Sequence, residues 1–157
     1  MNVKKETRTT ILFQELEHIS QGKKSYQTFL NELKEEKTFT SLKDFISDYM
    51  SHRQDVTIPS IIRDSNLSKN YVYHICDGRK NPSKYKLTAL CIGAHMNLRE
   101  TQKALSLAGC SKLHPKNPAD AGIIVCINQN YKNVTEVDIF LAENGVESPF
   151  SKDGADK

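Results

Sequence analysis

The stretch T-I-P-S-I-I-R-D-S-N-L-S-K-N-Y-V-Y-H-I-C-D-G-R-K-N-P-S, residues 57–83, predicts two short helices, a tight turn between them and a basic exit loop. Thr57 is a good N-cap for the first helix. Asn66 falls in the turn, because asparagine tolerates the left-handed conformation better than most residues that carry a side chain. Ser68 is suited to cap the second helix, and Gly78 to end it.

Apolar residues recur through this stretch at helical spacing, so each predicted helix has one face that can enter a core. These apolar positions are Ile58, Ile61, Ile62, Leu67, Val72 and Ile75. The opposite face of the second helix is polar, and it carries Lys69, Asn70, Tyr73 and His74.

The stretch resembles the helix-turn-helix of the Cro/phage-repressor family, also called the xenobiotic-response-element family. The resemblance covers roughly residues 42–108, and the run L-S-K-N-Y-V-Y-H-I-C-D-G-R-K-N-P-S matches the second helix and exit loop of the family position by position. The residues that carry it are Ile61, Ile62, Asn66, Leu67, Ser68, Tyr71, Val72, Ile75, Gly78, Asn81, Pro82 and Ser83. It implies an all-α, Cro/repressor-like helix-turn-helix bundle and double-stranded DNA as the partner.

In that family the second helix, here residues 68–77, enters the major groove of DNA. The residues expected to read base edges are Lys69, Asn70, Tyr73 and His74. The residues expected to hold phosphates are Ser68, Arg79, Lys80, Asn81 and Lys84. Tyr71 is compatible with either a backbone contact or packing in the core.

The charge distribution agrees with a nucleic-acid partner. The chain carries a net charge of +3, and residues 63–86 alone carry +4, whereas residues 1–62 are neutral and residues 87–157 carry −1. Positive charge is therefore concentrated on the second predicted helix and its exit loop, where a phosphate backbone would bind. A solvated loop that is basic by chance is the alternative explanation of the charge alone.

Composition and length indicate an ordinary globular chain without a membrane segment. The 157 residues are 38% hydrophobic and 26% charged, which is enough apolar material for one core. No apolar run approaches the roughly 18 residues of a membrane span, and the first residues lack the apolar stretch of a secretory signal. The four cysteines, Cys76, Cys91, Cys110 and Cys126, form no C-x-x-C pair. We therefore expect a reducing, cytoplasmic location, with Cys91 and Cys126 in the core.

Four parts are expected along the chain. They are an N-terminal helical extension (1–39), the DNA-binding core (40–113), a C-terminal helical hairpin packed on the core (114–150) and a disordered tail (151–157). Apolar periodicity predicts helices at 9–19 and 25–34 in the extension. In the core, Thr40 or Ser41, Ser83 and Asn97 are expected to cap three further helices, and Glu100 completes a capping-box pattern with Asn97.

The C-terminal hairpin resembles a copy of the preceding one. A shift of 36 residues pairs Asn81-Pro82 with Asn117-Pro118, and it also aligns apolar, capping and glycine positions. The further pairs are Leu87 with Ile123, Asn97 with Asn133, Leu98 with Val134, Glu100 with Glu136, Leu105 with Leu141, and Gly109 with Gly145. A period in this range is typical of stacked helical hairpins, although shared cap chemistry alone explains some of the identities.

No catalytic motif is present in the sequence. The five histidines, His18, His52, His74, His95 and His114, form no H-E-x-x-H pair, and there is neither a glycine-rich phosphate loop nor a G-x-S-x-G motif. We therefore expect no enzymatic activity, no cofactor and no metal ion.

The sequence favours a sequence-specific transcriptional regulator that binds DNA as a homodimer, since a single helix reads too few base pairs for specificity. The departures of Ile58, Ile62 and Cys76 from the family pattern leave a second interpretation open. In it the chain is a protein-interaction adaptor that keeps the fold without operator binding. A third interpretation is an antitoxin-like module that does both. A protein partner would use residues 1–39 or 114–150.

Overall fold

The computed structural model describes residues 26–27 and 39–150. The chain divides into two units, Met1–Thr38 and Phe39–Lys157. Of the first unit only Tyr26 and Gln27 are described, and both are helical. The helices expected at 9–19 and 25–34 otherwise lie outside the described residues, as does the tail at 151–157.

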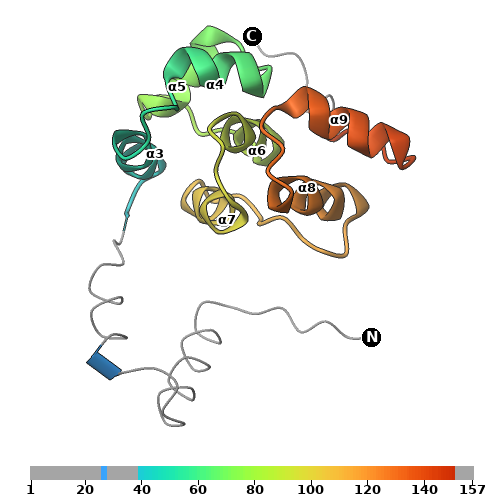
Figure 1. Cartoon of the computed structure of the whole chain (residues 1–157). Coiled ribbons are helices and arrows are strands. Elements are labelled where there is room, and N and C mark those ends of the chain that lie inside the picture. The colour runs from blue at the N-terminus through green and yellow to red at the C-terminus, as the bar shows by residue number, and fades with distance from the viewer. Residues whose placement is uncertain (1–25, 28–38, 151–157) are drawn as a thin grey trace. The chain divides into compact units, whose positions relative to one another are not determined.

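Seven helices and their connections make up residues 39–150, and this part of the chain contains no strand, so the all-α prediction is confirmed (Figure 1). They are α3 (Leu42–Ser51), α4 (Ile58–Ser65), α5 (Lys69–Cys76), α6 (Lys84–Gly93), α7 (Leu98–Leu107), α8 (Pro118–Asn128) and α9 (Val134–Glu143). None of the helices that the structure describes combines the length and the apolarity needed to cross a bilayer.

The α4–turn–α5 unit forms through local hydrogen bonds that the sequence anticipates. The Ser60 N–H donates to Thr57 Oγ1 at 3.2 Å, and the Thr57 N–H donates back to Ser60 Oγ at 2.9 Å. Asn66 ends α4 with φ at 61°, and the Ser68 hydroxyl then accepts the Tyr71 N–H at 3.1 Å. Gly78 follows α5 with φ at 77°. The predicted caps, the left-handed turn and the glycine stop are therefore confirmed.

The other predicted caps are confirmed with one correction. Ser41 caps α3 by accepting the Asp44 N–H, and Asn97 forms a complete capping box with Glu100 at the start of α7. Ser83 occupies the N-cap position of α6 with an extended backbone, but its side chain makes no capping hydrogen bond. The start of α6 is fixed instead by side chains that contact Asp120 of α8.

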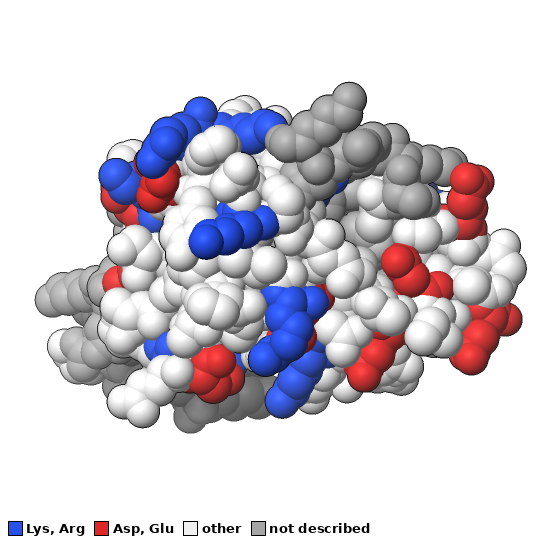
Figure 2. Space-filling model, turned by 90° about the horizontal axis from the view of Figure 1, so that it is seen from above, with Lys and Arg blue, Asp and Glu red and all other residues white. Residues whose placement is uncertain are grey.

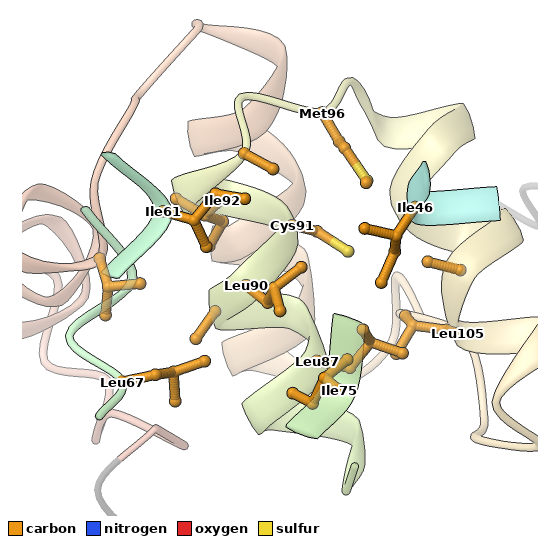
Figure 3. Packing of buried hydrophobic residues seen from close by; sticks show 14 of the residues in the cluster. Ile46, Ile61, Leu67, Ile75, Leu87, Leu90, Cys91, Ile92, Met96 and Leu105 are labelled. Atoms are coloured by element: carbon orange, nitrogen blue, oxygen red, sulfur yellow. The ribbon is translucent and has the colours of Figure 1, made fainter. Parts of the chain in front are cut away.

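Helix α6 is the centre of the core. Residues 87–93 are all buried, so this helix has no solvent face along most of its length. Figure 3 shows apolar side chains on both sides of it, with Ile61 and Leu67 on one side and Ile46, Met96 and Leu105 on the other. A helix surrounded in this way lacks the single apolar stripe of an amphipathic surface helix.

Helix α4 crosses α6 at Gly93. A Cβ atom on Gly93 would lie 2.9 Å from the Ser65 backbone nitrogen and 3.0 Å from the Ile61 carbonyl oxygen. Only glycine allows the two backbones to approach this closely. The contact attaches the α4–turn–α5 unit rigidly to the middle of the core.

The chain forms two successive helical hairpins, α6–α7 and α8–α9, at the positions that the 36-residue shift indicates. Helices α7 and α9 begin 36 residues apart, and Gly109 and Gly145 end them with φ at 73° and 71°. After the first helix of each hairpin, the equivalent left-handed residues His95 and Asn130 lie 35 residues apart. The second hairpin therefore has an inter-helix loop one residue longer.

The second hairpin packs on the first, and α9 also contacts α4. Its fully or nearly fully buried apolar residues are Ile123, Cys126, Ile127, Val134, Val137 and Leu141. Val125 and Ile139 of this hairpin are instead 41% and 53% exposed.

Candidate nucleic-acid interface

Helix α5 has one face in the core and one in solvent. Tyr71, Val72 and Ile75 are buried, which fixes the rotation of the helix about its axis. Lys69 and Asn70 are exposed in its first turn. The four residues predicted to read bases are therefore placed together on one helix face, with Tyr73 exposed and His74 half-buried behind Lys69 and Asn70.

The exit loop after α5 places a lysine over an aromatic ring. The Lys80 ammonium lies 4.5 Å from the ring centroid of Tyr71, within the range of a cation–π contact. This contact holds the Lys80 side chain beside α5 and leaves its charge exposed. The Arg79 guanidinium, in contrast, donates to Asp77 at 2.9 Å, although both groups remain largely exposed. Asn81 is exposed in the same loop.

Lys84 differs from the other predicted phosphate-binding residues. Its ammonium donates to Asp120 Oδ2 at 2.8 Å, and its side chain is only 20% exposed. The Asp120 carboxylate is fully buried and also accepts the Tyr85 hydroxyl and the His114 N–H. Lys84 is thus engaged in a tertiary ion pair between α6 and α8, and we leave it out of the phosphate-binding set below.

Two further lysines lie near α5 that the sequence analysis did not single out. The Lys86 ammonium is 5.4 Å from the Tyr71 ring centroid, and the aliphatic part of Lys43 covers Gly78. Lys43 comes from α3, so only the tertiary fold reveals that it lies beside the end of α5. Lys86, in contrast, could have been proposed from the sequence. It lies two residues after Lys84, in the first turn of the predicted helix that follows the exit loop.

The two ends of this face differ in charge. Figure 2 shows Lys and Arg side chains over the left and centre of the view, the side on which Figure 1 places α3, α4 and α5, with some acidic side chains among them. Acidic side chains gather at the right edge, on the side of α9, which carries Glu136, Asp138 and Glu143. An approaching polyanion would therefore be attracted towards α5 and repelled from α9.

The three residues that depart from the family pattern have a packing role in this structure. Ile58, Ile62 and Cys76 are partly buried against the hydrophobic core. Burial, with a smaller effect of Asp77, raises the pKa of the Cys76 thiol to about 11, so the thiol is uncharged at neutral pH. All three side chains therefore contribute apolar contacts to the packing of α4 and α5.

The second hairpin supports the α4–α5 turn. The Asn66 amide donates to Thr135 Oγ1 in the first turn of α9 at 3.1 Å. On the other side of the turn, the His95 Nε2 atom lies 3.3 Å from Asp64 Oδ2. Residues of both hairpins therefore contact the turn that orients α5.

Among the described residues, no group of three or more His, Cys, Asp or Glu side chains is placed to bind a metal ion. All four cysteines are free thiols, and burial raises the pKa of Cys126 to about 11 and that of Cys91 further. The prediction that Cys91 and Cys126 are core residues is confirmed, because both have no exposed surface.

Comparisons with family models, with curated proteins and with solved structures find no match to this chain.

Proposed function

We propose that this chain is a sequence-specific DNA-binding protein of the Cro/repressor helix-turn-helix type that regulates transcription in the cytoplasm. The observation that carries the proposal is the orientation of α5. Its core residues turn Lys69, Asn70 and Tyr73 to solvent at the N-terminal end of the helix. That end is the part of a recognition helix that contacts base edges in the major groove.

The side chains on this face have suitable chemistry. Asn70 offers the amide pair that binds adenine bidentately, and Lys69 is a donor for the O6 and N7 atoms of guanine. Lys69 has no ion-pair partner within residues 39–150, so its charge is available to a ligand. Tyr73 and His74 extend the same face by one turn.

Phosphate binding is proposed for residues that surround α5. Ser68 and Asn81 lie at its two ends, and Arg79 and Lys80 are in the exit loop. Lys43 and Lys86 add positive charge beside them. Each such contact adds to affinity for any sequence and sets the position of α5 on the duplex.

We further propose that the chain binds DNA as a homodimer on a two-fold-related site. One α5 helix contacts only a few base pairs, and two half-sites about one helical turn apart (~34–36 Å) supply the remaining specificity. Sedimentation of the complex should show two chains per site, and one chain per site would contradict the dimer.

Filter binding of the purified chain to duplex DNA across a salt series tests the proposal. Affinity should fall steeply with salt, with a slope of log K against log salt near −0.9 for each phosphate contacted. An absence of any retained DNA at low salt would reject DNA binding.

A second candidate function is a protein-interaction adaptor. It is favoured by the exposed Val125 and Ile139 and by a hollow of about 350 Å³ on α9, which is lined by Tyr131, Ile139 and Phe140 between Glu136 and Glu143. In this case the wild-type chain would retain no DNA at any salt concentration, and Val125→Ser with Ile139→Ser would abolish capture of the partner. DNA retention by the wild-type chain therefore distinguishes the two candidates.

A further inference from the structure

A cavity of about 380 Å³ lies between the inter-helix loops of the two hairpins. Equivalent residues of the two loops face it: His95 and Asn130 are the left-handed residues that follow α6 and α8. The next residues, Met96 and Tyr131, donate their N–H groups to Cys91 and Cys126 in matching helix-end motifs. The cavity is therefore lined by equivalent, well-defined positions of the two hairpins. Its volume exceeds approximately 300 Å³, the lower limit for small-molecule sites.

The lining of this cavity is cationic on one side. Arg53 and Lys132 both line it, and no Asp or Glu does. Arg53 donates to Asp55 through two nitrogens and to the Tyr49 hydroxyl through a third, which leaves two of its five N–H donors unused. Lys132 has no ion-pair partner within residues 39–150.

The other walls supply an apolar surface and neutral amides. Met96 and Ile127 are nearly fully buried, and the half-buried Tyr131 ring lies beside them. The Asn97 side-chain oxygen accepts the Glu100 N–H, so its amide nitrogen remains a donor. A cavity with an apolar floor, amide donors, the Lys132 cation and the two unused N–H donors of Arg53, whose charge is paired with Asp55, fits a molecule with an apolar body and one negative end.

We propose that this cavity binds a small organic carboxylate, with the carboxylate at Lys132 and Arg53 and the apolar body against Met96, Ile127 and Tyr131. Two short connections join the cavity to the turn before α5. In the first connection, His95 of the cavity lining contacts Asp64. In the second, Lys132 is followed directly by the N-cap Asn133 and the first turn of α9, where the Thr135 hydroxyl accepts a hydrogen bond from the Asn66 amide. Asp64 and Asn66 flank Ser65, so both connections reach the same turn.

Occupation of the cavity therefore biases the position of the turn and hence of α5. This regulatory part rests on the proposed DNA binding, whereas the binding of the carboxylate does not. A change in DNA affinity of about 5- to 150-fold is the usual size of such coupling.

The binding test uses thermal shift and calorimetry on the full chain without DNA. The probes are benzoate, phenylacetate and hexanoate, each compared with its uncharged amide. At least one carboxylate should bind with a dissociation constant below about 1 mM, the upper end of usual metabolite recognition. Its amide should bind at least tenfold more weakly. Equal binding of acid and amide, or no binding of any acid, would overturn the site.

Two matched variants locate the site. Lys132→Gln should lose at least tenfold in affinity for the bound carboxylate, while Lys116→Gln, in the loop before α8 and outside the cavity lining, should bind as wild type. Circular dichroism confirms that both variants fold. Retention of binding by Lys132→Gln would contradict the assignment.

The coupling test measures DNA affinity with and without saturating carboxylate. A change of at least fivefold, absent in Lys132→Gln, supports the regulatory part. Unchanged DNA affinity in a chain that binds both ligands would overturn it. A chain that binds the carboxylate but no DNA at all would refute the proposed function and leave the cavity site standing.

Discussion

Lys80 lies over the Tyr71 ring and keeps its charge at the surface, so its removal should reduce attraction to phosphate without moving α5. Lys80→Ala should weaken binding to all DNA sequences by a similar factor and lower the salt slope by roughly one unit. Filter binding to several duplexes measures both quantities. Lys103→Ala, an exposed lysine of α7, is the control. A change in sequence preference instead of overall affinity would be inconsistent with a phosphate contact.

Asp120 in the first turn of α8 accepts two hydrogen bonds from the start of α6, from Lys84 and Tyr85, and a third from the His114 N–H in the loop before α8. Asp120→Asn keeps an acceptor oxygen but leaves the Lys84 ammonium, which is mostly buried, without its counter-charge. The free energy of unfolding should fall by about 3 kcal/mol, the lower end of the range for breaking a buried ion pair. Urea denaturation measures it.

The matched control for Asp120 is Asp77→Asn, which breaks the exposed ion pair with Arg79. Because exposed pairs contribute about 0–1 kcal/mol, this variant should remain close to wild type. An equal loss of unfolding free energy in the two variants would show that burial of Asp120 does not strengthen the contribution of its ion pair to stability.

At the scale of single residues, helix caps and turns could be predicted from the sequence, whereas contacts between distant residues could not. Thr57, Asn66, Ser68 and Asn97 were assigned correctly because a cap or a left-handed turn depends on neighbours within a few residues. The partner of Lys84 is 36 positions away, in a helix whose docking the sequence does not reveal. Lys84 was therefore expected at a phosphate, and the structure places it beside Asp120.

At the scale of elements, the close approach of α4 and α6 depends on Gly93. Alanine is the better helix former by about 1 kcal/mol, but its Cβ would lie against backbone atoms of Ser65 and Ile61, which cannot rotate away. We expect Gly93→Ala to reduce the free energy of unfolding by about 1–3 kcal/mol, as overpacking usually does. Chemical denaturation measures the change.

Gly122→Ala in α8 is the comparison variant. Its Cβ would meet only the end of the Leu141 side chain, which can change rotamer, so the loss of stability should be smaller. A Gly93→Ala variant as stable as wild type would show that α4 and α6 can separate without cost.

The position of α6 in the core illustrates why element-level prediction was incomplete. Its existence and its ends follow from Pro82, Ser83 and the apolar run. Its burial on all sides, including Thr88 and Gly93, does not follow, because a helix surrounded by others has no hydrophobic periodicity to detect. The cavity between the two hairpin loops was not predictable either, because it depends on how segments distant in the sequence dock.

At the scale of the whole molecule, the second hairpin contributes to the core of residues 39–150. Deletion of residues 115–157 would uncover the parts of α4, α6 and α7 that contact the second hairpin and remove buried side chains such as Ile123 and Leu141. Each large apolar side chain contributes about 1.5–3 kcal/mol when buried. The truncated chain should therefore melt well below the full chain, and an unchanged melting temperature in calorimetry would be incompatible with this packing.

The 36-residue shift located this hairpin from sequence because the capping asparagines and the closing glycines recur with it. It did not reveal which apolar residues face outward. Val125 and Ile139 are the exposed ones, and no element of residues 39–150 covers them.

The most direct test of the account measures sequence specificity at Asn70. Sites are first selected from a random DNA pool with the wild-type chain. The affinities for the preferred site and for unrelated DNA are then compared in Asn70→Ala and in the control Asn128→Ala, which changes an exposed asparagine at the end of α8. Asn70→Ala should lose about 1–3 kcal/mol on the preferred site alone and relax preference at one base pair, while the control stays unchanged. An unaltered ratio of specific to non-specific binding in Asn70→Ala would contradict the reading of DNA by α5.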